Sequence, residues 1–114
     1  MSKIFVCDDS YERHKLFRKK FPNDNIIFAI SAQEAIGILA EDMSWNLICL
    51  DHDLGGEVYV GSDEPNTGYQ VAKFLATKNP KCPIVVHSSN YWGAMKMLSC
   101  LPHAEYIPYF YQSE

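Results

Sequence analysis

The sequence has no apolar run that approaches the roughly 20 residues needed to cross a bilayer, and no signal-like segment before its first strand-like run. It also has no excess of basic residues, since 10 Lys and Arg against 14 Asp and Glu give a net charge of -4. Neutralising a nucleic-acid backbone needs a basic surface. These absences exclude a membrane span and a duplex nucleic-acid binder, and we expect a cytoplasmic protein whose phosphate ligand, if any, is small.

The four cysteines form no CxxC pair, and Cys7 and Cys49 lie in apolar runs. We therefore expect reduced thiols rather than disulfides or a zinc site. At 114 residues the chain has room for one domain, which we take to span residues 1–114.

Short β-rich runs alternate with amphipathic runs along the chain. Strands are predicted at 3–7, 25–30, 47–50, 83–87 and 105–110, and helices at 11–21, 32–41, around 71–75 and at 91–101. Ser10 is a predicted N-cap, and Ser31 with Glu34 forms a capping box. This alternation implies an α/β fold with a five-stranded parallel sheet between helical layers. Too few residues follow 110 for a further helix on the last strand.

Acidic and imidazole side chains follow three of these strands. Asp8 and Asp9 follow the first, residues 51–53 (Asp-His-Asp) follow the third, and His87 ends the fourth. Ligands of open parallel sheets bind beyond the carboxyl ends of the strands. Two carboxylates about 4 Å apart repel by roughly 4 kcal/mol at an effective dielectric constant near 20. A bound cation, a raised carboxyl pKa or a nearby Lys could compensate, and we favour Mg²⁺ or Mn²⁺ because the donors are oxygens.

His52 and His87 are the candidate proton-transfer groups, because imidazole titrates near neutral pH. A lone His after an apolar strand is more often structural, but here two of them follow neighbouring strands beside acids. Ser88, Ser89 and Asn90 offer donors that suit an anionic oxygen, although helix capping would explain them equally well. Gly55 opens a long polar loop of the kind that is often functional.

Other conspicuous side chains are expected to be structural. The basic residues of the first helix read as its solvated face, and they are Arg13, Lys15, Arg18, Lys19 and Lys20. His14 and His103 are given no chemical role. Met95, Met97, Trp45 and Trp92 are expected to pack, although Trp92 is close enough to the site to stack a base.

The sequence resembles the response-regulator receiver domain over nearly its full length. The resemblance rests on the acidic pair Asp8 and Asp9, on Asp51 after the third strand and on Ser88 after the fourth. The resemblance implies a flavodoxin-like three-layer sandwich. It also implies that Asp51 accepts a phosphoryl group, that the acidic pair holds Mg²⁺ and that Ser88 contacts phosphoryl oxygens. The family has Lys before a Pro at the fifth strand, whereas here Ile107 precedes Pro108.

A closer resemblance is to a divergent branch, the cyclic-phosphate processing receiver domain. It rests on four motifs in the same order: LDHDLGG at 50–56, NTGYQVAKFL at 66–75, VHSSNYWGAMKM at 86–97 and IPYF at 107–110. It implies hydrolysis of cyclic-phosphate nucleotides or RNA ends, with the two histidines replacing the receiver Lys. Tyr91 stands where that family's pattern has Pro.

The leading hypothesis is a metal-assisted phosphoesterase that acts on a cyclic-phosphate nucleotide or an RNA-end phosphate, and the expected partner is a small phosphate-containing ligand such as a cyclic nucleotide. The predicted site comprises Asp8, Asp9 and Asp51 for the metal, His52, His87 and Asp53 for catalysis, and Gly55, Ser88, Ser89 and Asn90 for the substrate. The alternative is a non-catalytic receiver-like signalling or binding module that takes a nucleotide or a protein partner. A third possibility is a working phosphoacceptor at Asp51.

Overall fold

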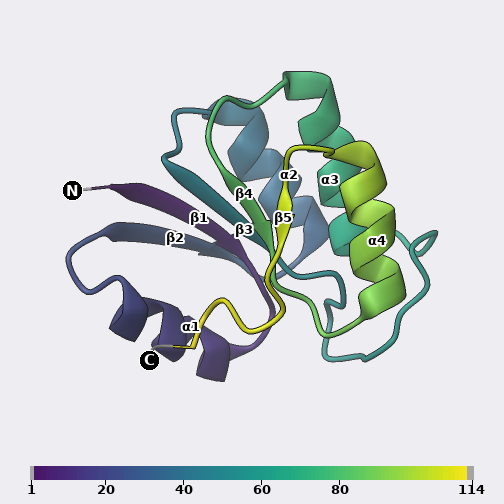
Figure 1. The fold of residues 1–114 in the computed structure, drawn as a ribbon, viewed down its shortest axis with the longest axis horizontal. Coiled ribbons are helices and arrows are strands. Elements are labelled where there is room, and N and C mark those ends of the chain that lie inside the picture. The colour runs from purple at the N-terminus through teal and green to yellow at the C-terminus, as the bar shows by residue number, and fades with distance from the viewer. Residues whose placement is uncertain (1, 113–114) are drawn as a thin grey trace.

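A computed structural model describes residues 2–112, which form a five-stranded sheet between two helical layers (Figure 1). The elements in chain order are β1 (Lys3–Cys7), α1 (Tyr11–Lys20), β2 (Asn25–Ala29), α2 (Ala32–Glu41), β3 (Leu47–Leu50), α3 (Gly68–Lys78), β4 (Ile84–Val86), α4 (Tyr91–Cys100) and β5 (Glu105–Tyr106).

The strands are all parallel and lie in the order β2-β1-β3-β4-β5. Helices α2, α3 and α4 cover one face, while α1 and the segment after β5 lie against the other (Figure 1). The predicted α/β, flavodoxin-like three-layer sandwich is confirmed. Within residues 2–112 the chain turns after β5 and forms no further helix.

Side chains of successive strand residues point to opposite faces of the sheet, because a strand has a period of two. Cys7, Leu50 and Val86 belong to the hydrophobic cluster under α2, α3 and α4. Val6 and Cys49 point the other way and pack with Phe17 of α1. This alternation decides which face each residue beyond a strand end reaches.

Helix starts follow the predicted capping chemistry. Ser10 Oγ accepts a hydrogen bond from the Arg13 backbone N–H at 3.3 Å, and Ser31 Oγ accepts one from Glu34 at 3.1 Å. Each satisfies one of the backbone donors that a helix N-terminus leaves free. The predicted starts of α1 and α2 are therefore confirmed.

The predicted extent of the fifth strand, to residue 110, is wrong. The Ile107 N–H still donates to Val86 at 2.9 Å, but Pro108 has no N–H with which to continue the ladder. The chain then turns, and Phe110 donates to Ile107 at 3.1 Å. The turn directs Tyr111 back toward the sheet edge, where it lines the cavity described below.

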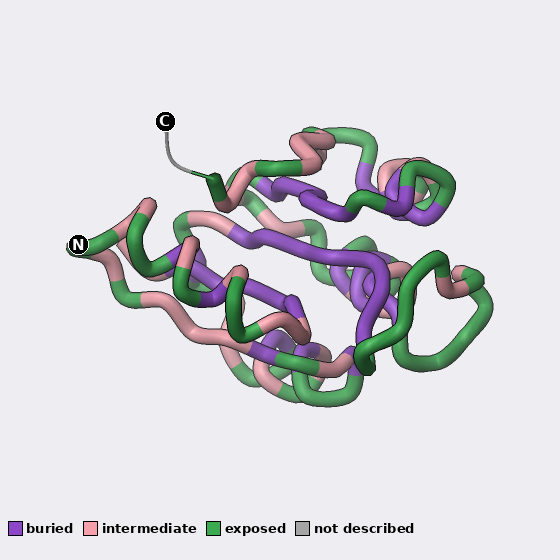
Figure 2. Tube along the Cα trace, turned by 90° about the horizontal axis from the view of Figure 1, so that it is seen from below, coloured by how far each residue is buried: buried purple, intermediate pink, exposed green. Residues whose placement is uncertain are grey.

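The segment between β3 and α3 is a largely exposed loop that projects from the carboxyl edge of the sheet (Figure 2). Its two ends are pinned together, because Asp53 pairs with Thr67 in an isolated bridge and the Gly68 N–H donates to His52 at 2.8 Å. Gly55 and Gly56 have φ of 77° and 79°, a region that favours glycine. The loop is thus anchored beside Asp51.

Gly68 is where α3 touches the end of β3, and a Cβ there would lie 1.9 Å from the Asp51 carbonyl oxygen. We expect Gly68→Ala to lower the free energy of unfolding by at least about 1–3 kcal/mol, the usual cost of overpacking. Gly37→Ala is the matched control, because nothing lies within 4 Å of that Cβ inside α2. It should raise the same quantity by about 0.5–1 kcal/mol. Urea unfolding of both variants measures this, and a tolerated Gly68→Ala would contradict the close contact.

None of the described helices is long and apolar enough to cross a membrane. Cys7, Cys49, Cys82 and Cys100 are all free thiols, as the absence of CxxC spacing predicted.

Candidate functional site

The register of the sheet brings three functional side chains into one row. Cys7 pairs with Leu50, and Leu50 pairs with Val86, so the next residues are Asp8, Asp51 and His87 on adjacent strands. All three share the parity that points to the α1 face. Their ligand-type atoms lie within 4.8 Å of one another, and all three residues are buried.

His87 is bound directly to the acidic row. Its Nε2 lies 2.8 Å from Asp8 Oδ2, and both side chains are completely buried. Phe17 and Tyr111 meet the imidazole edge-on, with ring centroids 5.2 and 5.9 Å away. His87 Nδ1 is buried without a hydrogen-bond partner among the described residues. The less costly tautomer therefore carries its proton on Nε2 and donates it to Asp8, because an unpaired buried N–H is expensive.

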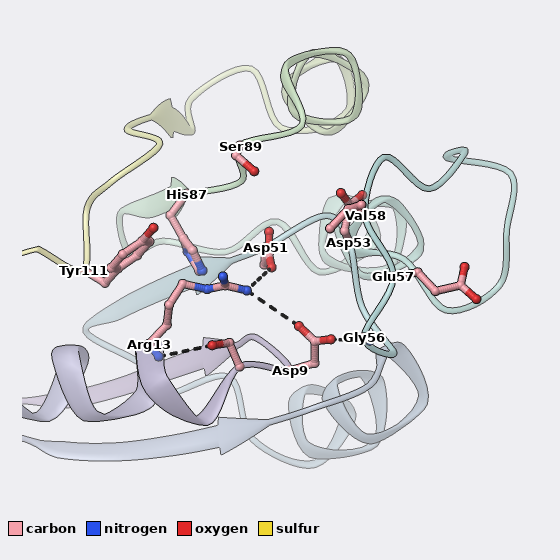
Figure 3. A pocket seen from close by; sticks show the side chains of 11 residues that line it. Asp9, Arg13, Asp51, Asp53, Gly56, Glu57, Val58, His87, Ser89 and Tyr111 are labelled. Carbon is pink, nitrogen blue, oxygen red and sulfur yellow. Dashed lines mark hydrogen bonds and ion pairs between the residues drawn. The ribbon is translucent and has the colours of Figure 1, made fainter.

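Arg13 of α1 supplies a cation that the sequence analysis did not anticipate. Its Nε and Nη2 donate to the two Asp8 oxygens at 2.7 and 2.8 Å, a bidentate pair. Nη2 also donates to Asp51 at 3.1 Å and lies 3.7 Å from Asp9. The expectation that Arg13 belongs to a solvated helix face is wrong, since it faces the sheet edge (Figure 3).

An open cavity of about 310 Å³ lies over this cluster (Figure 3). Arg13, Asp51 and His87 form its floor, and Tyr111 and Ser89 reach it from the C-terminal half of the chain. Residues 56–58 of the loop, together with Asp9, Ser10 and Asp53, complete the lining. The cavity has room for a phosphate group with part of its ester, and it has donors and acceptors at one end.

The pKa values of the two buried carboxyls of the cluster are shifted in opposite directions. Burial alone would raise the pKa of Asp8, but hydrogen bonds from His87 and Arg13 lower this pKa to about 2. Burial raises the pKa of Asp51 to about 6, and the neighbouring Asp8 carboxylate adds to the rise. Hydrogen bonds to Asp8 raise the pKa of Arg13. In the metal-free protein, repulsion is therefore relieved both by a guanidinium and by a raised carboxyl pKa.

The raised pKa of Asp51 predicts a pH dependence of stability in EDTA. Ionised Asp51 is disfavoured in the folded state, so stability should fall as pH rises from about 4 to 6, by on the order of 1–3 kcal/mol. Asp8 acts oppositely, because its lowered pKa contributes stability that is lost as pH falls toward 2. Urea unfolding of wild type and Asp51→Asn between pH 4 and 7 isolates the Asp51 contribution. Parallel curves for the two proteins would refute it.

His52 does not join this cluster. It is one residue beyond Asp51 and therefore points to the opposite face, where its ring packs against Gly93 of α4. The ring is fully buried, with Nδ1 at 2.8 Å from Asp53 and Nε2 at 2.9 Å from Ser62. The prediction that His52 and His87 work as a pair in one cavity does not fit this placement, and His52 instead braces the loop.

Asp53 lines the cavity, but its oxygens are largely used by the loop. They accept hydrogen bonds from the backbone of Tyr59 and Val60 at 2.6 and 3.2 Å and from Asn90 at 3.0 Å. Burial would raise the pKa of Asp53, but these bonds and the one with His52 lower it. The carboxylate holds Tyr59 at a φ of 55°, an uncommon conformation for a bulky residue. Asp53 is thus an anchor for the loop that walls the cavity.

The four predicted substrate contacts separate into different environments. Ser89 is exposed and lines the cavity. Ser88 is buried and accepts from the Asn90 N–H at 3.0 Å, while Asn90 caps α4 by accepting from Gly93 at 3.0 Å. Gly55 lies outside this cavity, against Asn66. The Ser88 hydroxyl and the Asn90 side-chain oxygen are thus both occupied by hydrogen bonds at the start of α4.

A comparison with protein families identifies the family of this chain. Residues 3–103 match the family described as the cyclic-phosphate processing receiver domain. The chain belongs to this family. The family recognised from the sequence is therefore confirmed, and three of its four motifs lie within the matched range, whereas IPYF at 107–110 lies beyond it. A search of curated proteins finds no match.

Solved structures similar to this cyclic-phosphate processing receiver domain are receiver domains and response regulators. The non-phosphorylated HemR receiver domain of Leptospira biflexa matches with a TM-score of 0.73 and 15% identity, over 96% of this chain and 83% of that chain. The BeF3-activated DrrB receiver domain gives 0.69 and 16%, over 96% and 86%. NtrX of Brucella abortus gives 0.68 and 20%, over 93% of this chain but 23% of NtrX, so this chain spans about a quarter of that protein. These likenesses show the fold.

The basic group of this cyclic-phosphate processing receiver domain comes from an unexpected element. Ile107 follows β5 in register with His87, at the position where the receiver pattern has Lys. Arg13, from α1 on the other side of the cluster, reaches the acids instead. Sequence reasoning missed it because Arg13 sits in a run of basic residues, although its spacing of four from Asp9 was visible.

Proposed function

We propose that this protein is a metal-assisted phosphoesterase that opens a small cyclic phosphate or removes a terminal one. The observation that carries the proposal is the cluster of Asp8, Asp51, His87 and Arg13, in which Arg13, Asp51 and His87 line an open cavity and Asp8 lies buried behind them. In a member of the cyclic-phosphate processing family, this cluster combines ligands for a cation, a group for proton transfer and a group for anion binding.

The donor set fits Mg²⁺ or Mn²⁺. Asp8 and Asp51 offer buried carboxylate oxygens, and Asp9 is close enough to contact Arg13 at the same point. If His87 ligated the ion through Nε2, its proton would move to Nδ1, which is buried without an acceptor among residues 2–112. We therefore assign the ion to the three carboxylates, an oxygen set typical of these hard cations. A similar structure, TrrA of Thermotoga maritima, is described as a complex with Mg²⁺ and BeF, which supports the choice of a divalent ion for this fold.

Arg13 is the proposed phosphate-binding residue. Its guanidinium neutralises Asp8 and Asp51 in the metal-free protein and is one-third exposed to the cavity. If these carboxylates held a divalent ion, the Nη groups of Arg13 would be free to bind the non-bridging oxygens of a phosphate, which guanidinium binds in bidentate fashion. Ser89 on the opposite wall offers a hydroxyl to the same group.

His87 is the proposed proton-transfer group: with a proton on each ring nitrogen, it would give the Nε2 proton, which faces the acidic row, to the released oxygen and would regain one from the attacking water. In the reaction, the oxygen of a water molecule forms a bond to phosphorus while the bond from phosphorus to one ribose oxygen breaks. One proton of that water ends on the released oxygen. When bound, the metal ion supplies Lewis-acid polarisation and lowers the pKa of a bound water.

The test is turnover of a panel of 2′,3′-cyclic nucleotides and terminal phosphomonoesters with Mn²⁺, followed by chromatography. We expect a cyclic nucleotide to be converted to one monophosphate by the wild-type protein, and Asp51→Asn to be inactive. A full panel without turnover, from protein that binds Mn²⁺, would overturn the proposal.

The second candidate is a receiver-like binding module that takes a small phosphate ligand or a protein partner without chemistry. The observation in its favour is that Arg13 and the raised pKa of Asp51 already balance the cluster without a metal. Ligand binding that is unaffected by Mn²⁺ and never followed by turnover would favour this candidate. A cytoplasmic location remains a prediction that is consistent with four free thiols.

A further inference from the structure

Besides the imidazole of His87, one aromatic side chain lines the cavity in the part of the chain that the structure describes, and it is Tyr111 from the turn after β5. We propose that Tyr111 is a phosphate-binding residue, whose hydroxyl donates a hydrogen bond to an oxygen of the phosphate that Arg13 holds. The inference rests on the proposed function for its ligand. It goes further because it assigns a contact from the C-terminal turn and the side of the cavity on which the phosphate lies.

Other aromatic side chains near this edge of the sheet are exposed but lie outside the cavity. Trp92 is 78% exposed, Tyr109 57% and Tyr91 52%. The expectation that Trp92 packs in the core is therefore wrong. None of these three side chains belongs to the cavity lining, whereas the half-buried Tyr111 does. Tyr111 is thus the aromatic group that is placed to contact a ligand beside Arg13.

The Tyr111 hydroxyl is a donor that the protein itself leaves unused. Within residues 2–112, the Tyr106 hydroxyl donates to the Ser88 carbonyl at 3.0 Å, whereas the Tyr111 hydroxyl has no hydrogen-bond partner. Burial raises the pKa of Tyr111 by more than the neighbouring Arg13 lowers it. The phenol therefore keeps its proton at neutral pH and can donate it to an acceptor that enters the cavity.

Neighbouring rings hold the Tyr111 ring in place. The centroid of His87 lies 5.9 Å away, that of Phe17 6.0 Å and that of Tyr109 6.3 Å. The turn is closed by a hydrogen bond of 3.0 Å from the Gln112 N–H to the Tyr109 carbonyl. Because the donor is already oriented, little conformational entropy is lost when a ligand binds to it.

The distribution of charge around the cavity favours one position for an anion. Asp53 and Glu57 lie on one side of the cluster, and Tyr111 lies on the other side, next to His87 (Figure 3). The Arg13 guanidinium carbon is 5.8 Å from the centre of the Tyr111 ring, close enough for one phosphate group to accept hydrogen bonds from both residues. A phosphate in this position contacts two donors and stays away from the carboxylates of the loop.

The first test observes the Tyr111 hydroxyl by NMR. Protein labelled with carbon-13 at the tyrosine carbon that bears the hydroxyl is titrated with inorganic phosphate in the presence of Mg²⁺. The Tyr111 resonance is assigned from its absence in Tyr111→Phe. We expect phosphate to shift this resonance and to leave that of Tyr109 in place. An unshifted Tyr111 resonance at saturating phosphate would overturn the proposal, as would a wild-type protein that binds no phosphate.

The second test measures phosphate affinity by calorimetry, again with Mg²⁺. Tyr111→Phe should bind phosphate at least about tenfold more weakly than the wild type, because it loses a hydrogen bond to a charged group. It keeps the ring that packs against His87 and Phe17, so its melting temperature should not change. Tyr109→Phe removes a hydroxyl from the neighbouring exposed ring and should bind phosphate like the wild type. Equal affinities of the two variants would refute the contact.

Hydrolysis by the same variant separates this inference from the proposed function. We expect kcat/KM for a cyclic nucleotide to fall at least about tenfold in Tyr111→Phe, because the phosphate contact is also lost in the transition state. If phosphate binding depends on Tyr111 but no cyclic phosphate is hydrolysed, the proposed function fails alone. If Tyr111→Phe hydrolyses a cyclic nucleotide with the kcat and KM of the wild type, the inference fails and the proposed function stands.

Discussion

Hydrolysis of a cyclic nucleotide is expected to fall by a factor of about 10²–10⁴ when His87 is replaced by alanine, the usual contribution of a positioned acid or base. The cause is the loss of Nε2, the imidazole nitrogen that faces the acidic row at 2.8 Å from Asp8. Because Arg13 still reaches Asp8 and Asp51, nucleotide binding should change by less than about tenfold. The effect should therefore appear in kcat rather than in KM.

His103→Ala is the matched control for this experiment, because His103 is exposed in a turn at the opposite end of the sheet. Its activity should equal that of the wild type. His52→Ala is expected to act differently, lowering stability through the loss of its bonds to Asp53 and Ser62. If His87→Ala keeps wild-type kcat, proton transfer by His87 is refuted.

Arg13→Gln is expected to bind Mn²⁺ at least about tenfold more tightly than the wild type, while its hydrolytic activity falls. In the wild type the ion must displace guanidinium hydrogen bonds of 2.7–3.1 Å from Asp8 and Asp51. Hydrogen bonds to charged groups contribute about 1.5–3 kcal/mol each, and one such bond corresponds to a factor of ten or more. Activity falls because the variant has no guanidinium to bind the phosphate.

Thermal unfolding gives a second readout of the same substitution. Without metal, Arg13→Gln should be less stable than the wild type, since Asp8 stays buried without its guanidinium partner. Mn²⁺ should then raise the melting temperature of Arg13→Gln more than that of the wild type. Lys15→Gln removes the same charge from an exposed position on α1 and is the control. Weaker Mn²⁺ binding in Arg13→Gln than in Lys15→Gln would show that Arg13 does not compete with the ion.

Most of the fold follows from the sequence, because strands and helices alternate with clear periods and caps. The strands at 3–7 and 47–50 have the predicted ends, and the Ser31 cap is formed as expected. The fifth strand was predicted too long because IPYF at 107–110 has strand-like composition. In the structure the strand ends earlier, because Pro108 has no N–H to continue the ladder and the chain turns after it.

The site was only half predictable, and the reason is side-chain parity. Listing Asp51, His52 and Asp53 as one group ignores the fact that neighbours in an extended chain point to opposite faces. Because Leu50 pairs with Val86, the side chains of Asp51 and His87 point to the same face of the sheet, and that of His52 points to the opposite face. The sequence does not determine the register between the strands. The alternation of side chains after Leu50 nevertheless places Asp51 and His52 on opposite faces of the sheet, which argues against His52 and His87 acting together.

Two further contributions come from tertiary packing that the sequence pattern does not reveal. Arg13 shares its basic run with Lys15 and Arg18, and only the docking of α1 shows that it alone reaches the acids. Tyr111 reaches the cavity through the turn that ends β5. In both cases the functional direction of the side chain is set by a contact between elements distant in sequence.

The most direct test of the central claim is ³¹P NMR of a 2′,3′-cyclic nucleotide with the protein and Mg²⁺ in oxygen-18-labelled water. A metal-assisted phosphoesterase built on Asp8, Asp51 and His87 should replace the cyclic-phosphate resonance with that of a phosphomonoester carrying the label, and EDTA should stop the conversion. A cyclic phosphate that stays intact beside protein with bound Mg²⁺, or that is opened equally well in EDTA, would contradict the account.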